Sequence, residues 1–252
     1  MSVKKLFTRA EFEQLLKESA SGMAADKKLQ ADALNVFIEA DKHRWVHQTR
    51  WMGEPILNIP HDMFAIQDII FRTRPKFILE IGVAWGGALL FYATLMEILG
   101  GEKIIGVDIF IPEDLKERLT RIEKLARHFT LIQGSSVEAP TIDKIKAMIG
   151  DCRDVLLIVD SHHTHEHVMK ELEAYAPLVG PGHYIVCSDT IIDNIPPQEH
   201  RPREWGPGNN PKTAVFEFLK KYPDFMIDTE LENKLLFTCN PQGYLVRKKA
   251  PA

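Results

Sequence analysis

Cysteine is scarce in this 252-residue chain, and a strong excess of charge of one sign is absent. The three cysteines, Cys152, Cys187 and Cys239, are far apart and odd in number. They fit neither a disulfide framework nor a metal-binding spacing, so we expect reduced thiols in a cytoplasmic protein. Lys and Arg total 31 against 35 Asp and Glu, a formal net charge of −4. This balance gives no reason to expect a nucleic-acid partner.

Long hydrophobic runs are also missing. No apolar stretch approaches the roughly 20 residues that a membrane-spanning helix requires. The first five residues, MSVKK, lack the apolar core of a signal peptide. With 45% hydrophobic and 26% charged residues, the composition is typical of a soluble globular protein.

Short apolar runs instead alternate with helical stretches from residue 77 onward. This alternation predicts an α/β fold in which helices cover both faces of a mostly parallel sheet. The last short strand candidates lack a long helix between them, which predicts an antiparallel hairpin at the sheet edge. The expected strands are 77–81, 103–107, 130–133, 155–159, 184–187, 225–227, 235–238 and 244–247; the expected helices lie near 88–99, 113–127, 140–149, 165–178 and 211–219.

The stretch FILEIGVAWGG, residues 77–87, is typical of a buried strand followed by a glycine turn and a helix start. Glycine at 82, 86 and 87 lets a ligand approach the backbone, and the helix start offers unpaired N–H groups. The dinucleotide fingerprint G-x-G-x-x-G is absent, because Ala84 stands where its second glycine would be. The pattern E-x-G-x-x-x-G-G resembles the first motif of S-adenosylmethionine (AdoMet) dependent methyltransferases.

Each expected parallel strand ends in polar residues, and ligands of open α/β sheets bind outside the carboxyl ends of the strands. We expect Glu80 and the glycine turn to hold the amino-acid part of AdoMet. Asp108 is expected to accept both ribose hydroxyls, a geometry that nicotinamide cofactors share. The cofactor-binding residues expected at this edge are Glu80, Gly82, Val83, Gly86, Gly87, Asp108, Ile109, Gly134, Ser135, Ser136 and Asp160, with 134–136 near the adenine.

A second polar cluster, DSHHTHEH, begins at Asp160 directly after the fourth strand. Asp160 and Asp189 follow strands that should be neighbours, and hard cations such as Mg²⁺ prefer carboxylate oxygens. We therefore expect Mg²⁺ at Asp160 and Asp189, with Ser188 as a further oxygen ligand. A catalytic base is expected among His163, His165 and Asp160, because imidazole titrates near neutral pH.

The N-terminal residues 1–60 are expected to form a helical cap that contributes to a homo-oligomer contact, and 61–252 the catalytic domain. Thr8 followed by Glu11 is typical of a helix capping box. The apolar stripe that follows consists of Phe12, Leu15 and Leu16.

Further predictions concern the starts of two helices and one long loop. Asp62 is expected to cap a helix that runs to Phe71. Residues 191–209 are long and proline-rich, and we expect a substrate lid there because long loops in compact domains are frequently functional. Asn210 followed by Pro211 predicts the start of the next helix.

The combined pattern resembles the cephalosporin hydroxylase (CmcI-like) family over roughly residues 45–248. The resemblance rests on W-x-G-x-P at 51–55 with P-x-D at 60–62, DSHHTHEHV at 160–168, the run 182–192, and WGPG at 205–208. It implies a Rossmann-like class I methyltransferase fold with a seven-stranded, mostly parallel sheet. Relatives in this family methylate hydroxyls of antibiotics and sugars, including rhamnosyl groups of glycolipids.

The resemblance also implies what the chain binds. The cofactors are AdoMet and Mg²⁺, with the metal on Asp160 and Asp189, and the acceptor is a hydroxyl of a sugar, glycolipid or other natural product. Ser188 stands where the family commonly has Glu, and His162 where it frequently has Asp. The oxygen ligands and the local charge therefore differ from the family pattern.

Other interpretations of the same residues stay open from the sequence alone. An NAD-dependent oxidoreductase would share the fold and Asp108, but it lacks the second glycine. A metal-dependent hydrolase centred on Asp160 and the histidines would leave Glu80 and the glycine turn unexplained. A zinc site among the histidines would lack the zinc-finger and H-E-x-x-H spacings. A non-catalytic relative that binds the cofactor would be consistent with Ser188.

Overall fold

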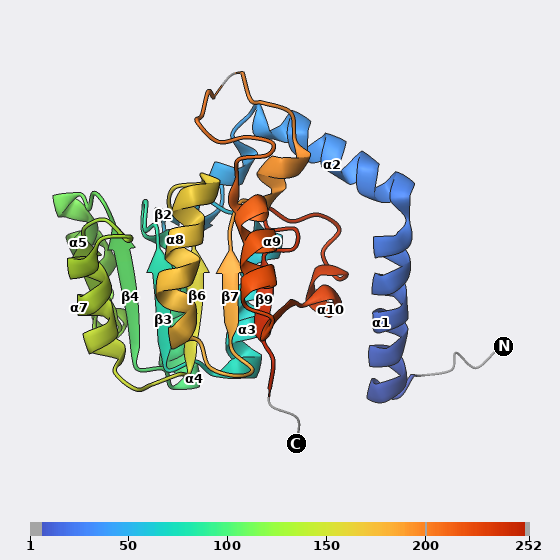
Figure 1. The fold of residues 1–252 in the computed structure, drawn as a ribbon. Coiled ribbons are helices and arrows are strands. Elements are labelled where there is room, and N and C mark those ends of the chain that lie inside the picture. The colour runs from blue at the N-terminus through green and yellow to red at the C-terminus, as the bar shows by residue number, and fades with distance from the viewer. Residues whose placement is uncertain (1–6, 200, 250–252) are drawn as a thin grey trace.

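The computed structural model describes residues 7–199 and 201–249 (Figure 1), so the N-terminal MSVKK segment lies outside the described residues. The helices are α1 (Arg9–Ala25), α2 (Lys27–Asp41), α3 (Pro60–Thr73), α4 (Gly87–Leu99), α5 (Glu113–Thr120), α6 (Glu123–Ala126), α7 (Ala139–Ile149), α8 (His165–Tyr175), α9 (Pro211–Lys221) and α10 (Thr229–Glu232), with 3₁₀ turns η1 (Trp45–His47), η2 (Ala176–Leu178) and η3 (Thr190–Asn194). The strands are β1 (Arg50–Trp51), β2 (Glu54–Pro55), β3 (Phe77–Ile81), β4 (Lys103–Asp108), β5 (Phe129–Gln133), β6 (Val155–Val159), β7 (Tyr184–Cys187), β8 (Phe225–Ile227) and β9 (Tyr244–Arg247).

The main sheet has seven strands in the order β5-β4-β3-β6-β7-β9-β8. The first five of these strands run parallel, and β9 pairs antiparallel with both β7 and β8. The chain moves outward from β3 to β5 and then returns to β6 on the other side of β3. The carboxyl ends of β3 and β6 therefore lie at a topological switch point, where ligands of such sheets bind.

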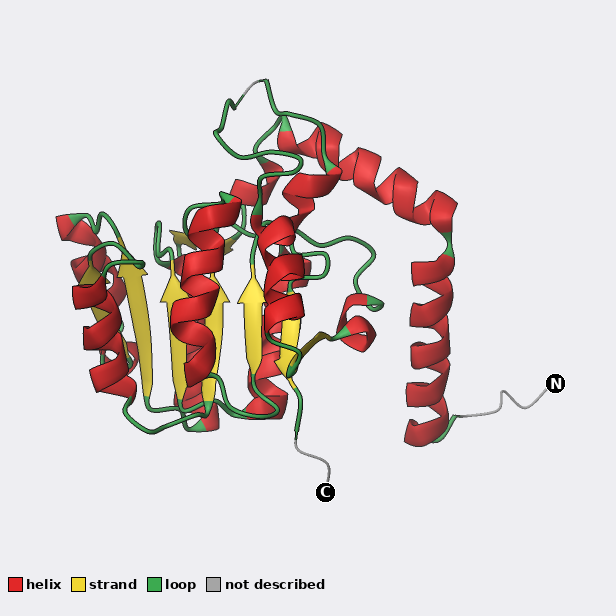
Figure 2. Ribbon diagram, viewed as in Figure 1, coloured by secondary structure: helices red, strands yellow, loops and turns green. Residues whose placement is uncertain are grey.

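Helices cover both faces of this sheet, as the apolar strands require (Figure 2). One face packs against α3, α4, α5 and α6 through a core that includes Ile66, Leu89 and Leu115. The other face packs against α7, α8 and α9, with Ile145 and Leu172 among the buried residues. The predicted α/β fold and its seven-stranded sheet are thus confirmed.

The N-terminal helices differ in how they contact the rest of the chain. α1 has the predicted Thr8–Glu11 capping box but buries none of its residues, and it stands apart from the sheet in Figure 1. Its expected role in an oligomer stays a prediction. α2 contributes Phe37 to a buried cluster with Ile191 and Ile195, so it packs on the segment predicted as a lid.

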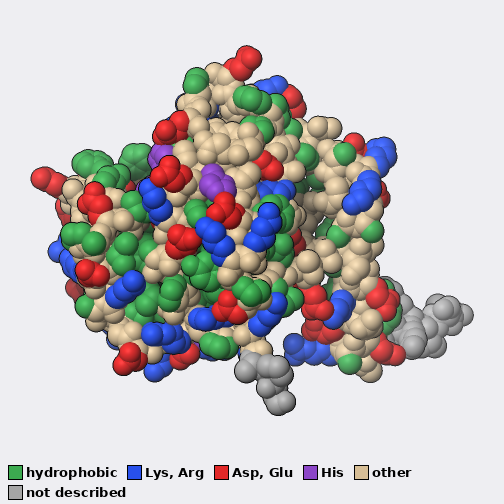
Figure 3. All heavy atoms as spheres, in the orientation of Figure 1, with side chains coloured by type: hydrophobic (Ala, Val, Ile, Leu, Met, Phe, Trp, Pro, Cys, Tyr) green, Lys and Arg blue, Asp and Glu red, His purple; other side chains and the backbone are tan. Residues whose placement is uncertain are grey.

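Acidic and basic side chains are interspersed over α8 and α9 on the face shown in Figure 3. All three cysteines are described and free, with Cys187 and Cys239 buried. In the described part of the chain, no helix combines the length and the apolarity needed to span a bilayer.

Two predicted elements differ in their details. Residues 235–238 do not form a strand, so the antiparallel edge consists of β8 and β9, with α10 between them. The helix expected over 113–127 is interrupted, giving α5 and α6.

The predicted role of Asp62 is wrong. α3 begins after Ile59 with Pro60 at its first position, so Asp62 is not its cap. Asp62 is fully buried, and its carboxylate accepts hydrogen bonds from Tyr244 and from the segment 238–239. Burial raises the pKa of Asp62 to about 6, and these hydrogen bonds oppose that rise.

Candidate active site

A cavity of about 820 Å³ opens at the carboxyl ends of the parallel strands. Its size is within the range of small-molecule sites. The glycine turn and the ends of β4, β5, β6 and β7 line one part, and α2 and residues 191–207 line the rest. Every site residue predicted from the sequence lines this cavity except Gly86 and His165.

Glu80 lies deep in this cavity and is 3% exposed. The Tyr92 hydroxyl on α4 donates a hydrogen bond to its carboxylate, but Oε2 has no partner in the described structure. Burial raises the pKa of Glu80 to about 8, with a further rise from the Asp108 charge. A buried carboxylate oxygen without a donor fits a ligand that brings a cationic N–H group, such as the ammonium of an amino acid.

The glycine turn is shaped by close backbone packing. Gly82 has φ +97°, and a Cβ there would lie 2.0 Å from the Asp160 carbonyl oxygen. A Cβ on Gly87 would lie 2.3 Å from the Pro55 carbonyl oxygen. Gly86 also has a positive φ, and a Cβ there would meet Leu115 and Leu119 of α5, so its place in the turn is explained while its cofactor contact stays a prediction.

Asp108, at the end of β4, supports the same turn. One carboxylate oxygen accepts hydrogen bonds from the backbone N–H groups of Val83 (2.9 Å) and Ala84 (3.1 Å), and the other from Phe110 (3.1 Å). A carboxylate has about four acceptor positions, so Asp108 retains capacity for a ligand hydroxyl. The adjacent Ile109 is 70% exposed and offers an apolar surface at the cavity wall.

The end of β5 is joined to α8 by a buried carboxylate. Ser136 donates a hydrogen bond to Glu171, which also accepts one from Ser161 at 2.6 Å and contacts His167 Nε2 at 3.1 Å. Ser136, Ser161 and His167 all line the cavity. Glu171 therefore fixes the polar wall beside Gly134 and Ser135.

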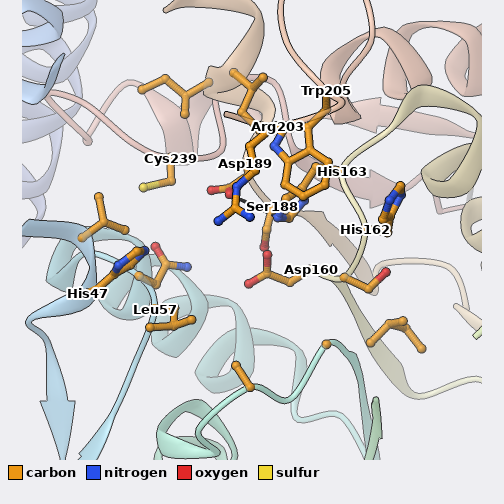
Figure 4. Close-up of a pocket in the computed structure, with 18 of the residues that line it drawn as sticks. His47, Leu57, Asp160, His162, His163, Ser188, Asp189, Arg203, Trp205 and Cys239 are labelled. Carbon is orange, nitrogen blue, oxygen red and sulfur yellow. Dashed lines mark ion pairs between the residues drawn. The ribbon is translucent and has the colours of Figure 1, made fainter. Parts of the chain in front are cut away.

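The strongest cluster for a metal ion comprises Asp160, His163 and Asp189. One ligand atom from each lies within 4.8 Å of the other two, and the three side chains point to the same part of the cavity (Figure 4). Asp189 has φ +56°, a strained conformation for a residue with a side chain. Ser188 is buried and its Oγ lacks a hydrogen-bond partner in the described chain, so it remains a candidate ligand.

The charges in this region favour a bound cation. The pKa of Asp160 is raised well above its usual range, first by burial and then by the negative charges of Asp189 and Glu80. Carboxylates placed this close repel one another unless a proton or a cation lies between them. The two carboxylates fit Mg²⁺ or a similar hard divalent ion, and the imidazole of His163 lies beside them.

The histidines separate into different environments. His163 Nε2 lies 3.3 Å from Asp189, and its ring packs against Trp205 at 5.0 Å. Burial lowers the pKa of His163, so its imidazole is neutral near pH 7. His165 faces away from the cavity, because its ring contacts Thr213 (2.8 Å) and Glu217 (3.1 Å) of α9. The described structure thus places His165 outside the cavity lining, and its role as a catalytic base stays a prediction.

The residues of α2 and of the segment 191–207 that line the cavity were not predicted individually from the sequence. Asp41 of α2 is 3% exposed, and Arg201 donates to both of its carboxylate oxygens at 3.0 and 3.1 Å. Gln198 donates to the same carboxylate, and Arg201 contacts His47 at 3.2 Å. These residues come from segments about 160 positions apart, so no local pattern in the sequence connects them.

Tyr92 was also missed, although its position offered a signal. It lies on α4 after the glycine turn, on the side that faces Glu80. Arg203, which also lines the cavity, lies over the Trp205 ring at 5.3 Å and points into the cavity in Figure 4.

Comparison with known proteins gives consistent results. Residues 43–248 match the model of a family described as rhamnosyl O-methyltransferase/CmcI. A rhamnosyl O-methyltransferase of Mycobacterium leprae (strain TN) is 28% identical over 220 residues, covering 84% of this chain and 91% of that protein. Its counterpart in Mycobacterium bovis (strain BCG / Pasteur 1173P2) is 26% identical over 219 residues, covering 83% and 85%. A CmcI structure with Mg and SAM is 22% identical, covers 81% of this chain and 78% of that chain, and shares the fold with a TM-score of 0.53.

Proposed function

Because the chain belongs to the rhamnosyl O-methyltransferase/CmcI family of enzymes, we propose that it transfers a methyl group from AdoMet to a hydroxyl of a sugar or sugar-containing natural product. The expected class of enzyme and the expected family agree with this membership. The acceptor and the requirement for Mg²⁺ are part of the proposal. The relatives named for rhamnosyl transfer support a deoxysugar as the first acceptor to test.

One observation carries the proposal: Glu80 and the Asp160–Asp189 pair face the same cavity. Glu80 offers a buried acceptor to the AdoMet ammonium, and the glycine turn and Asp108 line the path of the nucleoside. The aspartates lie at neighbouring strand ends, where a divalent ion would supply charge that favours the deprotonated acceptor oxygen. AdoMet is favoured over NAD because the chain has no diphosphate-binding G-x-G-x-x-G turn.

The chain itself supplies alignment and a base. AdoMet would supply the methyl group: the acceptor oxygen would bond to its methyl carbon as the carbon–sulfur bond breaks, and the sulfur would keep the electron pair. We assign His163 to take the hydroxyl proton, because its neutral ring lies beside the aspartates. Much of the remaining rate enhancement would come from positioning the oxygen and the methyl group in this cavity.

The proposal is tested by incubating the protein with methyl-labelled AdoMet and a panel of rhamnosides and other sugars, with and without EDTA. We expect label transfer to at least one hydroxylated sugar and loss of transfer with EDTA. Transfer that persists in EDTA would remove the ion from the scheme. A thermal shift with NAD but none with AdoMet or S-adenosylhomocysteine would favour an oxidoreductase instead.

His163→Asn is expected to lower kcat by about 10²- to 10³-fold, because a positioned base contributes roughly that factor. The affinity for Mg²⁺ should change little, since Asp160 and Asp189 remain. The measurements are label transfer and Mg²⁺ titration calorimetry. A large loss of Mg²⁺ affinity with little effect on saturated kcat would identify His163 as a ligand rather than a base.

Arg201→Gln is expected to raise the KM for the acceptor by about tenfold, with little change in AdoMet affinity. Arg201 ties the lid segment to Asp41, and loss of such a partly buried ion pair costs a few kcal/mol. Lys212→Gln is the matched control, because Lys212 bonds Asn194 of the lid outside the cavity. Equal acceptor KM values in the two variants would exclude this role for Arg201.

A further inference from the structure

We propose that Asp62 and Asn240 are positioning residues that orient Asp189 for metal binding through one buried hydrogen-bond network. This inference rests on the proposed function, which places a divalent ion at Asp189. Neither Asp62 nor Asn240 lines the cavity, so each would act through Asp189 and not by touching substrate.

Asp62 anchors the segment 238–244 from α3. Its Oδ1 accepts hydrogen bonds from the Thr238 hydroxyl and from the Tyr244 hydroxyl (2.9 Å), and its Oδ2 accepts one from the Cys239 N–H at 2.8 Å. Asp62 and Tyr244 are fully buried, and Thr238 is 8% exposed. A buried carboxylate with this many donors holds its partners in one arrangement.

The carboxylate of Asp62 sets the direction of the bonds that its two hydroxyl partners make with Asn240. The Thr238 and Tyr244 hydroxyls each give their only proton to Asp62, so toward Asn240 they can only accept. Asn240 accordingly donates its backbone N–H to Thr238 at 2.9 Å and its Nδ2 to Tyr244 at 3.3 Å. The amide oxygen of Asn240 is left to face the N–H of Asp189, which donates to it at 3.0 Å.

The residues at and after Asp189 are joined to the same segment. The Thr190 hydroxyl donates to the Pro241 carbonyl at 2.8 Å, and the Ile191 N–H donates to the Cys239 carbonyl at 3.0 Å. Asp189 itself adopts φ +56°, which costs free energy and persists only where surrounding contacts hold it. These bonds explain how the Asp189 side chain is kept toward Asp160 and His163.

The network predicts a specific consequence of Asp62→Asn. The new amide keeps its oxygen toward the Cys239 N–H, so its NH₂ group faces the two hydroxyls. The Thr238 and Tyr244 hydroxyls then accept from position 62 and turn their protons toward the donors of Asn240. Donors of Asn240 would then face hydroxyl protons. We expect the side-chain amide of Asn240 to turn so that its oxygen accepts from a hydroxyl, and this turn brings its NH₂ group against the Asp189 N–H.

The test measures Mg²⁺ binding to the full chain by titration calorimetry and AdoMet binding in the same way. We expect Asp62→Asn to weaken Mg²⁺ binding by about 10- to 100-fold, as loss of a group that orients a metal ligand typically does, and to leave AdoMet affinity unchanged. Tyr244→Phe should weaken Mg²⁺ binding in the same direction. Tyr184→Phe is the matched control, because it removes another buried tyrosine hydroxyl, bonded to Asp228, at the opposite end of β7.

The outcomes separate this inference from the proposed function. Equal Mg²⁺ affinity in the unmodified protein and Asp62→Asn would overturn the positioning role. If Asp62→Asn does not fold, equal Mg²⁺ affinities in Tyr244→Phe and Tyr184→Phe would overturn it instead. An unmodified protein that binds AdoMet but no Mg²⁺ would overturn the metal site itself and this inference with it.

Discussion

Asp160→Asn is expected to abolish detectable Mg²⁺ binding and to lower kcat/KM for methyl transfer by about 10³-fold. The ion would supply several kcal/mol of stabilisation to the reacting oxygen, and Asn removes a charged ligand without changing the side-chain shape. Label transfer and Mg²⁺ calorimetry measure the two effects. Asp189→Asn should behave in the same way, because both carboxylates belong to one cluster.

The thermal stability of these variants should not fall with their activity. Burial and the charge of Asp189 disfavour the ionised form of Asp160, so a neutral Asn at this position should maintain or raise the midpoint of unfolding. Asp224→Asn is the control, because Asp224 pairs with Arg247 at the sheet edge, away from the cavity. Unchanged Mg²⁺ affinity in Asp160→Asn would contradict the proposed site.

Glu80→Gln is expected to weaken AdoMet binding by about 100-fold. The substitution keeps the size of the side chain but replaces a buried charge that would pair with the AdoMet ammonium, an interaction worth roughly 2–5 kcal/mol. Calorimetric titration with AdoMet measures the loss, and Mg²⁺ affinity serves as the internal control. An unchanged AdoMet affinity would show that the ammonium binds elsewhere.

The pH dependence of Glu80 gives a second readout of the same contact. Its pKa is about 8 in the folded protein against an ordinary value of 4.5. The unfolded chain therefore binds fewer protons between these values, and the free energy of unfolding falls by roughly 1.4 kcal/mol per pH unit as the pH rises through this window. Glu80→Gln should lack this slope and be more stable than the unmodified protein at pH 8.

Ionisation of Glu80 on binding should also release about one proton per AdoMet at pH 7. The heat of binding should then differ between buffers with different ionisation enthalpies. Glu80→Gln should bind with the same heat in each buffer. A buffer-independent heat for the unmodified protein would mean that Glu80 stays protonated in the complex.

Much of the fold followed from local pattern. Short apolar runs such as 77–81 and 155–159 predicted strands, because their continuous burial on both faces leaves a signal within each run. Glu80, Asp108, Asp160 and Asp189 were predicted because each lies at or just after the end of an apolar run, and the sheet order brings these strand ends together. The sequence-based prediction failed where one residue type at one position is compatible with two structural roles. Asp62 has the residue type and position of a helix cap, yet burial directs it to the segment 238–244.

Side-chain direction explains why two other predicted site residues do not line the cavity. His165 lies two residues from His163, but the start of α8 turns its ring toward α9. Gly86 has the backbone conformation expected of the turn, while its missing Cβ gives room to α5 and not to a ligand. In both cases the residue has the spacing along the chain that the motif requires. That spacing does not determine the direction in which a side chain, or a missing Cβ, points.

The order of residues by itself determined the alternation of strands and helices, the glycine turn after β3 and the acidic strand ends, because each depends on neighbours within a few positions. Only the tertiary structure decided that Asp41 meets Arg201, that Asn240 holds Asp189, and that His163 alone of the two predicted histidine bases faces the cavity. Contacts between segments so distant in the chain depend on how the packed layers bring them together, and burial then selects which polar groups can pair.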